Sequence, residues 1–144
     1  MARGMTPSGV TIDVRAKRVY DAAEPDDGYR VLIDHVWPRG VSRERAHLDE
    51  WARELAPSDD LRKWFDHVPE RFDEFRSRYR RELAVHGERI AALRRQARKQ
   101  PVTIVYAARD REHNNGVVVA ELLRSPASQP KIARRSRRGR RRAV

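Results

Sequence analysis

Apolar positions alternate with polar ones in one short stretch and form compact runs in two others, a pattern typical of β-strands. In residues 11–20, Ile12 and Val14 alternate with polar neighbours, which predicts a strand with one solvent-facing side near a sheet edge. Residues 30–37 and 101–107 are dense apolar runs rich in β-branched side chains, and both are predicted to be buried strands.

Between the second and third predicted strands, the apolar spacing changes to the helical period. We expect a helix over residues 43–54, a second helix capped by Ser58, and a third that begins near Pro69. Gly87 is expected to kink or end the third helix before a further helical stripe, and Asn114 to cap a last helix. The positions expected to be buried are Ala46, Leu48, Trp51, Leu55, Leu61, Trp64, Phe65, Phe72, Phe75, Tyr79, Leu83, Ile90, Leu93, Ala97, Val117, Val118 and Leu122.

Long helical connections between apolar strands require crossovers, and crossovers join parallel strands. The sequence therefore predicts one α/β domain over residues 11–124, with a small central and mainly parallel sheet. Residues 1–10 lack periodicity and are expected to be flexible. Residues 125–144 combine a linker-like start with an arginine-rich end, and this composition predicts a disordered tail.

The formal net charge of +11 is concentrated in that tail, where residues 125–144 carry +8 and no acid, leaving +3 for the other 124 residues. Such a tail binds phosphate backbones without sequence preference, so nucleic acid is one expected partner. The other interpretation is a solvated extension without function. The tail arginines expected to contact phosphates are Arg134, Arg135, Arg137, Arg138, Arg140, Arg141 and Arg142.

Several classes of function lack support in the sequence. The chain has no cysteine, no P-loop, no glycine-rich dinucleotide fingerprint and no nucleophile elbow, and no cofactor is expected. His47 and Asp49 stand two residues apart on a predicted helix and do not face one site, so no metal site is expected. The absence of an apolar membrane span or signal segment makes a cytoplasmic location the expectation.

Ligands of open parallel sheets collect beyond the carboxyl ends of the strands, where two polar loops are predicted here, residues 34–40 and 109–114. Asp34 is a candidate base or orienting carboxylate, and His35 or His113 is a candidate proton carrier. Arg39 is a candidate bidentate clamp for a phosphate or carboxylate. The residues predicted to bind the ligand are Trp37, Arg39, Gly40, Lys63, Tyr106, Asp110, His113 and Asn114.

Three interpretations of these loops remain open. The first is binding of a small anion without chemistry, the second is catalysis, and the third is a purely structural or interaction role. In the structural interpretation Asp34 and Arg39 pair with each other and brace the turn, and Trp37 packs on the helices.

Several blocks of the chain resemble the YeaO-like branch of domain of unknown function 488, over about residues 15–124. The resemblance implies an α/β domain but no established activity. The blocks that carry it are Arg18-Val19-Tyr20, Gly28-Tyr29-Arg30-Val31-Leu32-Ile33-Asp34, Trp37-Pro38-Arg39-Gly40, Ala56-Pro57-Ser58, Leu61-Arg62-Lys63-Trp64-Phe65, and Val105-Tyr106-Ala107-Ala108 with Asn114.

The chain departs from that family pattern at two places in the predicted site. His35 stands where the pattern has arginine, and Asn114-Asn115-Gly116 stands where it has Asn-His-Ala. Chemistry that depended on those positions would be altered or lost in this chain. The leading hypothesis from the sequence is therefore a domain that binds an anionic small ligand between the two loops.

Overall fold

The structure is a computed structural model that describes residues 12–125. In this part of the chain, four parallel strands form one sheet in the order β1-β4-β2-β3. The strands are β1 (Val14–Arg18), β2 (Tyr29–Leu32), β3 (Glu50–Trp51) and β4 (Val102–Tyr106). The predicted α/β class with a parallel sheet is confirmed. The expectations for residues 1–10 and for the tail arginines lie outside the described residues.

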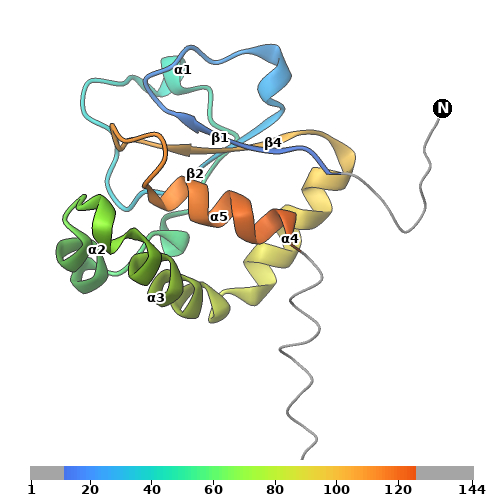
Figure 1. Cartoon of the computed structure of the whole chain (residues 1–144). Coiled ribbons are helices and arrows are strands. Elements are labelled where there is room, and N and C mark those ends of the chain that lie inside the picture. Colours follow the sequence, from blue (N-terminus) through green and yellow to red (C-terminus); the bar gives the residue numbers. More distant parts are fainter. Residues whose placement is uncertain (1–11, 126–144) are drawn as a thin grey trace, which may run out of the picture.

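The helices divide unevenly between the two faces of the sheet (Figure 1). The four longer helices lie on one side, where α5 packs on β1 and β4 and α3 packs on α5. Short α1 and the loops around it lie on the other side. The helices are α1 (Arg43–Ala46), α2 (Asp59–Phe65), α3 (Phe72–Ala84), α4 (Gly87–Lys99) and α5 (Asn115–Arg124), with 3₁₀ turns at Pro25–Asp27, Arg53–Leu55 and Pro69–Arg71.

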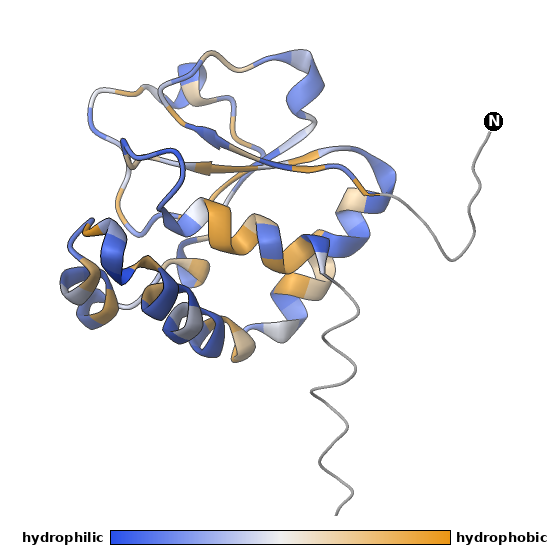
Figure 2. Cartoon of the chain, in the orientation of Figure 1, coloured by the Kyte–Doolittle hydropathy of each residue, from blue (hydrophilic) through white to orange (hydrophobic). Residues whose placement is uncertain are grey.

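The side chains of the central strands point alternately into two hydrophobic clusters. Val31 and Ile104 belong to the large core beneath the long helices, and Leu32 and Val105 belong to a small cluster on the opposite face. Hydrophobic residues predominate in α5 and β4, whereas α2 and α3 are largely hydrophilic on their outer sides (Figure 2). The clusters therefore hold the sheet from both sides and fix the positions of the loops that leave it.

Most of the predicted elements are confirmed, including the edge position of β1 and the caps of two helices. The Ser58 hydroxyl accepts a hydrogen bond from Leu61 N–H, and the Asn114 side chain accepts one from Val117 N–H. Gly87 begins α4, in keeping with the predicted interruption. No helix in residues 12–125 is long and apolar enough to cross a membrane.

The predicted helix over residues 43–54 is wrong. Helix α1 ends after one turn at His47, which has a φ of 48°, and the chain then runs beside β2 as strand β3. The cause is the buried Arg30, whose guanidinium donates to the carbonyls of Ala46 and His47. These carbonyls are thus used by a tertiary contact, which overrides the helical propensity of the segment.

Two further expectations need correction. The strand predicted over residues 30–37 ends at Leu32, because the chain turns after Ile33 into the loop that begins at Asp34. Four residues predicted to be buried are only partly so, namely Leu48, Trp51, Trp64 and Val117. Arginine side chains cover the exposed parts of the two tryptophan rings.

Candidate functional site

The two polar loops that follow β2 and β4 meet at the carboxyl edge of the sheet and enclose a cavity of about 770 Å³. Segments of α2 and α3 and of the chain before α2 close its far side. This volume lies within the range of ordinary small-molecule sites. The residues that line it are Tyr20, Asp34, His35, Val36, Trp37, Pro38, Arg39, Ala56, Pro57, Arg62, Phe65, His67, Phe75, Ala107, Ala108, Arg109, Asp110, Asn114 and Asn115.

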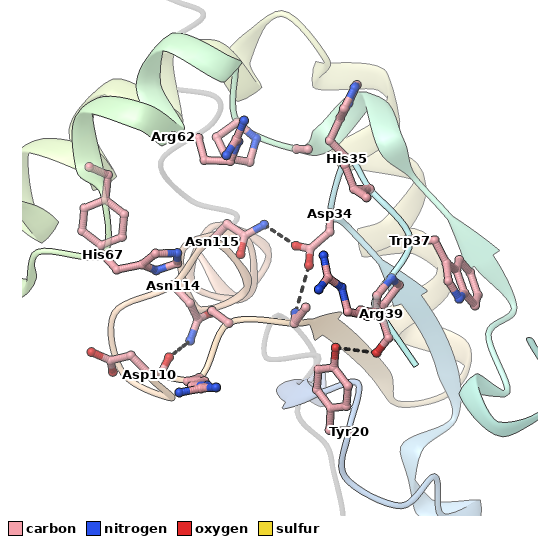
Figure 3. A pocket seen from close by; sticks show the side chains of 18 of the residues that line it. Tyr20, Asp34, His35, Trp37, Arg39, Arg62, His67, Asp110, Asn114 and Asn115 are labelled. Atoms are coloured by element: carbon pink, nitrogen blue, oxygen red, sulfur yellow. Dashed lines mark hydrogen bonds between the residues drawn. The ribbon is translucent and has the colours of Figure 1, made fainter. Parts of the chain in front are cut away.

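Asp34 lies at the centre of the site and is held by donors from two other elements (Figure 3). Its Oδ2 accepts the N–H of Ala107 at 2.9 Å, and its Oδ1 accepts Nδ2 of Asn115 at 2.9 Å. The Trp51 indole donates to its carbonyl at 2.7 Å. Burial raises the pKa of the Asp34 carboxyl above its usual value, and these two hydrogen bonds to the carboxylate oppose the shift only in part.

A buried tyrosine outside the cavity lining lies close enough to Asp34 to feel its charge. The hydroxyl of Tyr79 donates to the carbonyl of Leu55 at 2.5 Å, and its side chain is fully buried. Burial, together with the charge of Asp34, raises the pKa of Tyr79 well above its usual value. The phenol therefore stays neutral, and its hydrogen bond ties α3 to the chain before α2.

Arg39 is presented by a turn whose local chemistry explains the Trp37–Gly40 sequence. The Trp37 indole donates to the carbonyl of Val41 at 2.7 Å and closes the turn. Gly40 has a φ of 78°, a left-handed conformation that favours glycine. Tyr20 donates to the Arg39 carbonyl at 3.0 Å, so the backbone of Arg39 is fixed while its side chain points into the space between the loops (Figure 3).

The loop after β4 is built on Asp110. Its carboxylate accepts the N–H groups of Glu112 and His113 at 2.9 and 3.0 Å and contacts Nδ1 of His113 at 2.8 Å. These contacts lower the pKa of Asp110 below its usual value. Asn114 donates to the Asp110 carbonyl at 2.8 Å while it caps α5. Asp110 is therefore committed to the loop itself.

Three arginines give the cavity its positive character. Within residues 12–125, no hydrogen bond or ion pair engages the guanidinium of Arg39 or Arg109, whereas Arg62 makes one exposed ion pair with Asp59. The two carboxylates of the lining differ from these guanidinium groups, because Asp34 and Asp110 both accept hydrogen bonds from the protein. A negatively charged ligand is the natural complement of this arrangement.

The structure brings six of the predicted site residues together and leaves four outside the cavity lining. Gly40 shapes the turn, Lys63 is exposed on α2, Tyr106 is buried against Gly116, and His113 lies edge-on to Phe72 and pairs with Asp110. The six that line the cavity are Asp34, His35, Trp37, Arg39, Asp110 and Asn114. The pairing of Asp34 with Arg39 that the structural interpretation required is not formed.

Sequence reasoning missed Asn115 and Arg62 as members of the site, although signals for both were present. Asn115 follows the cap of a helix whose start faces the strand ends, the same argument that selected Asn114. Arg62 stands three residues before the buried Phe65 and shares its helix face, whereas Lys63 does not. Tyr20, His67 and Arg109 also line the cavity.

The lining offers a limited set of reactive side chains. Among the described residues, it contains no serine, threonine, cysteine or lysine that could act as a nucleophile. In the described part of the chain, Asp34 forms no hydrogen bond with either histidine of the lining, and the carboxylate–imidazole pair nearby is Asp110 with His113, which is outside the lining. No group of three or more metal-ligating side chains is present within residues 12–125.

The fold and the site define an α/β domain with a positively charged pocket at the carboxyl edge of a parallel sheet. The chain belongs to the DUF488 family, since residues 13–138 match the model described as the inactive DUF488-N3 subclade. The matched range extends past the domain boundary at residue 124 that the sequence predicts, so part of the arginine-rich segment falls inside it.

Curated bacterial relatives agree with this assignment. The chain is 44% identical over 117 residues to the uncharacterized protein YeaO of Escherichia coli, which covers 79% of this chain and 99% of that protein. Uncharacterized proteins of Mycobacterium bovis and Mycobacterium tuberculosis are 44% identical over 110 residues, covering 76% of this chain and 92% of theirs. No solved structure matches the chain.

Proposed function

We propose that this protein binds a small anionic ligand in the pocket between the two loops and does not turn it over. The observation that carries the proposal is the guanidinium of Arg39, which has no partner within residues 12–125 and which a hydrogen-bonded turn presents to a cavity of about 770 Å³. Arg62 and Arg109 add further positive charge to the same lining. A guanidinium fork binds carboxylate and phosphate groups with two parallel hydrogen bonds.

The absence of turnover is proposed on separate grounds. The described part of the lining lacks serine, threonine, cysteine and lysine, and both of its carboxylates accept hydrogen bonds from the protein. The word inactive in the description of the matching family model agrees with this proposal. His35 and Asn115 stand at the positions where the chain departs from the pattern to which it is similar, and both line the pocket.

Calorimetry and thermal unfolding with a panel of phosphates and carboxylates at constant ionic strength test the proposal. We expect at least one anion to bind and to raise the Tm, because a ligand that binds only the folded state stabilises it. Arg39→Ala should weaken that binding about 10- to 150-fold, since a hydrogen bond to a charged group contributes about 1.5–3 kcal/mol.

The matched control is Arg45→Ala, which removes the same charge from an exposed side chain on α1 that has no side-chain partner among the described residues. This control should leave the affinity within about twofold, because an exposed charge acts over distance only through a salt-screened field. Equal losses in the two variants, or no binding anion in the panel, would contradict the proposal. Conversion of a bound anion would contradict the absence of turnover.

We also propose that the arginine-rich segment contacts nucleic acid. The support is the charge pattern alone, +8 over residues 125–144 without an acid. Contacts of this kind are made with phosphates, are independent of sequence and weaken steeply with salt. This function would be independent of the pocket, so both can hold in one protein.

A further inference from the structure

The cavity has an extended apolar wall besides its arginines. Alanine, valine and proline side chains line it, together with the edges of the largely buried Phe65 and Phe75, which stack at a centroid distance of 4.4 Å and an interplanar angle of 23°. Trp37 forms part of the opposite loop and is held edge-on to Trp51 at 5.3 Å. An inorganic anion would leave this wall in contact with water, whereas a flat apolar group would cover it.

The Asp34 carboxylate adds an acceptor to the pocket that the protein does not saturate. A carboxylate accepts about four hydrogen bonds, and the described residues supply two, one to each oxygen. The two donors fix the orientation of the group, since one belongs to the residue after β4 and the other to the start of α5. Asp34 lines the cavity, so the remaining acceptor positions are available to a ligand.

The arginines and Asp34 favour different chemical groups, so they would bind different ends of one ligand. Arginine side chains of both loops and of α2 favour an oxyanion, while Asp34 repels one and favours an N–H or O–H group. In Figure 3, Asp34 lies at the centre of the site, and Arg62 lies apart from it on the α2 side. The apolar wall of the same cavity supplies a surface for a ring.

We propose that the pocket binds an aromatic oxyanion that carries a hydrogen-bond donor away from its anionic group. The arginines bind the oxyanion, the apolar wall contacts the ring, and the carboxylate of Asp34 accepts the donor. This inference rests on the proposed function and names the ligand class of the same site. Carboxylates and phosphate monoesters share the required oxyanion chemistry.

The test uses the full chain and pairs of probes that differ only in the donor. 4-Aminobenzoate is compared with 4-methylbenzoate, and 4-aminophenyl phosphate with 4-methylphenyl phosphate, by calorimetry at constant pH and ionic strength. We expect the amino member of at least one pair to bind tenfold more tightly than its methyl partner, a difference of about 1.4 kcal/mol. The pair that shows the larger preference identifies the oxyanion as carboxylate or phosphate.

Asp34→Asn should abolish the preference for the amino probe, whereas Glu112→Gln should preserve it, because Glu112 is exposed and outside the lining. A second measurement does not depend on the folding of a variant. In the wild-type protein, the amino probe should shift the NMR signals of the Ala107 amide and the Asn115 side-chain amide more than the methyl probe does, because both groups donate to Asp34.

The outcomes separate this inference from the proposed function. If the probes bind but the two members of each pair bind equally, the inference is overturned while anion binding stands. If inorganic phosphate binds as tightly as the aryl phosphates, the aromatic requirement is overturned. Failure of every anion, including those of the broader panel, overturns both. A tenfold preference that Asp34→Asn removes supports both.

Discussion

Asp34 and Asp110 occupy one pocket but meet opposite surroundings. Asp34 is removed from water and receives only two hydrogen bonds, so burial dominates and its pKa is raised. Asp110 is close to solvent and accepts two backbone N–H groups besides its contact with His113, so its pKa is lowered. The difference comes from the immediate contacts of each carboxylate, because both residues follow strands of the same sheet.

The first prediction is that NMR titration of the aspartate carboxyl carbons will place Asp34 above 3.8 and Asp110 below it. The two carboxyl groups contribute to the free energy of unfolding with opposite pH dependence. Folding raises the pKa of Asp34, so its contribution is favourable at low pH and is lost as pH rises through the raised pKa. Folding lowers the pKa of Asp110, so its contribution is present above 3.8 and is lost as pH falls through the lowered pKa.

The Asn115→Ala variant tests whether local hydrogen bonds set the pKa of Asp34. It removes one of the two donors that oppose the effect of burial, so the pKa of Asp34 should rise further, while that of Asp110 should stay unchanged. Equal shifts in both groups would indicate a long-range field rather than these local hydrogen bonds.

At the scale of residues, the sequence predicts which side chains lie at the site better than it predicts the groups to which they hydrogen-bond. Asp34 and Arg39 are correctly placed at one edge because the carboxyl ends of parallel strands must lie together. That Asp34 bonds to Asn115, rather than to the arginine five residues away, depends on how far α5 extends over the sheet. Distances of that kind arise from packing, which no local pattern specifies.

Among the elements, those with strong local signals are predictable and those formed by tertiary contacts are not. The caps of α2 and α5 follow from Ser58 and Asn114 alone. Strand β3 has only two residues and exists because β2 offers a free edge, to which Asp49 and Ala52 donate their N–H groups. The buried Arg30 that ends α1 acts from another element, so the one-dimensional pattern over residues 43–54 still reads as a helix.

The second prediction concerns the start of α2, which closes the pocket. The Ser58 hydroxyl accepts from Leu61 N–H and donates to Glu82 of α3 at 2.6 Å, and Ser58 N–H donates to the same carboxylate at 2.8 Å. Ser58→Ala should lower the free energy of unfolding by about 1 kcal/mol, as for other N-caps. Chemical denaturation measures the change.

A double-mutant cycle with Glu82→Ala separates the cap from the link between helices, since the two losses should not be additive if the residues are coupled. Ser77→Ala on the exposed side of α3 is the control and should change stability by less than about 0.5 kcal/mol. Additive losses would indicate that the contact between the helices contributes nothing beyond the cap.

For the whole molecule, charge and fold are separate properties. The predicted class, sheet direction and domain extent follow from strand and helix periodicity, and the first two are confirmed. The positive charge adds nothing to that argument, because most of it belongs to residues 125–144, and a net charge does not specify a fold. Two separate sets of arginines therefore carry the two proposed functions, one set in the pocket and one in the C-terminal segment.

The last prediction distinguishes those sets in the intact protein. Replacing the seven C-terminal arginines from Arg134 to Arg142 with glutamine removes seven positive charges, and it should abolish most binding to a random-sequence DNA duplex. Each phosphate contact contributes about −0.9 to the slope of log affinity against log salt concentration, so the slope should become several units shallower. Replacing Arg39, Arg62 and Arg109 with glutamine should preserve the slope and abolish binding of the small anion. A slope that depends on the pocket arginines instead would mean that nucleic acid is a ligand of the pocket, and the two functions would then be one.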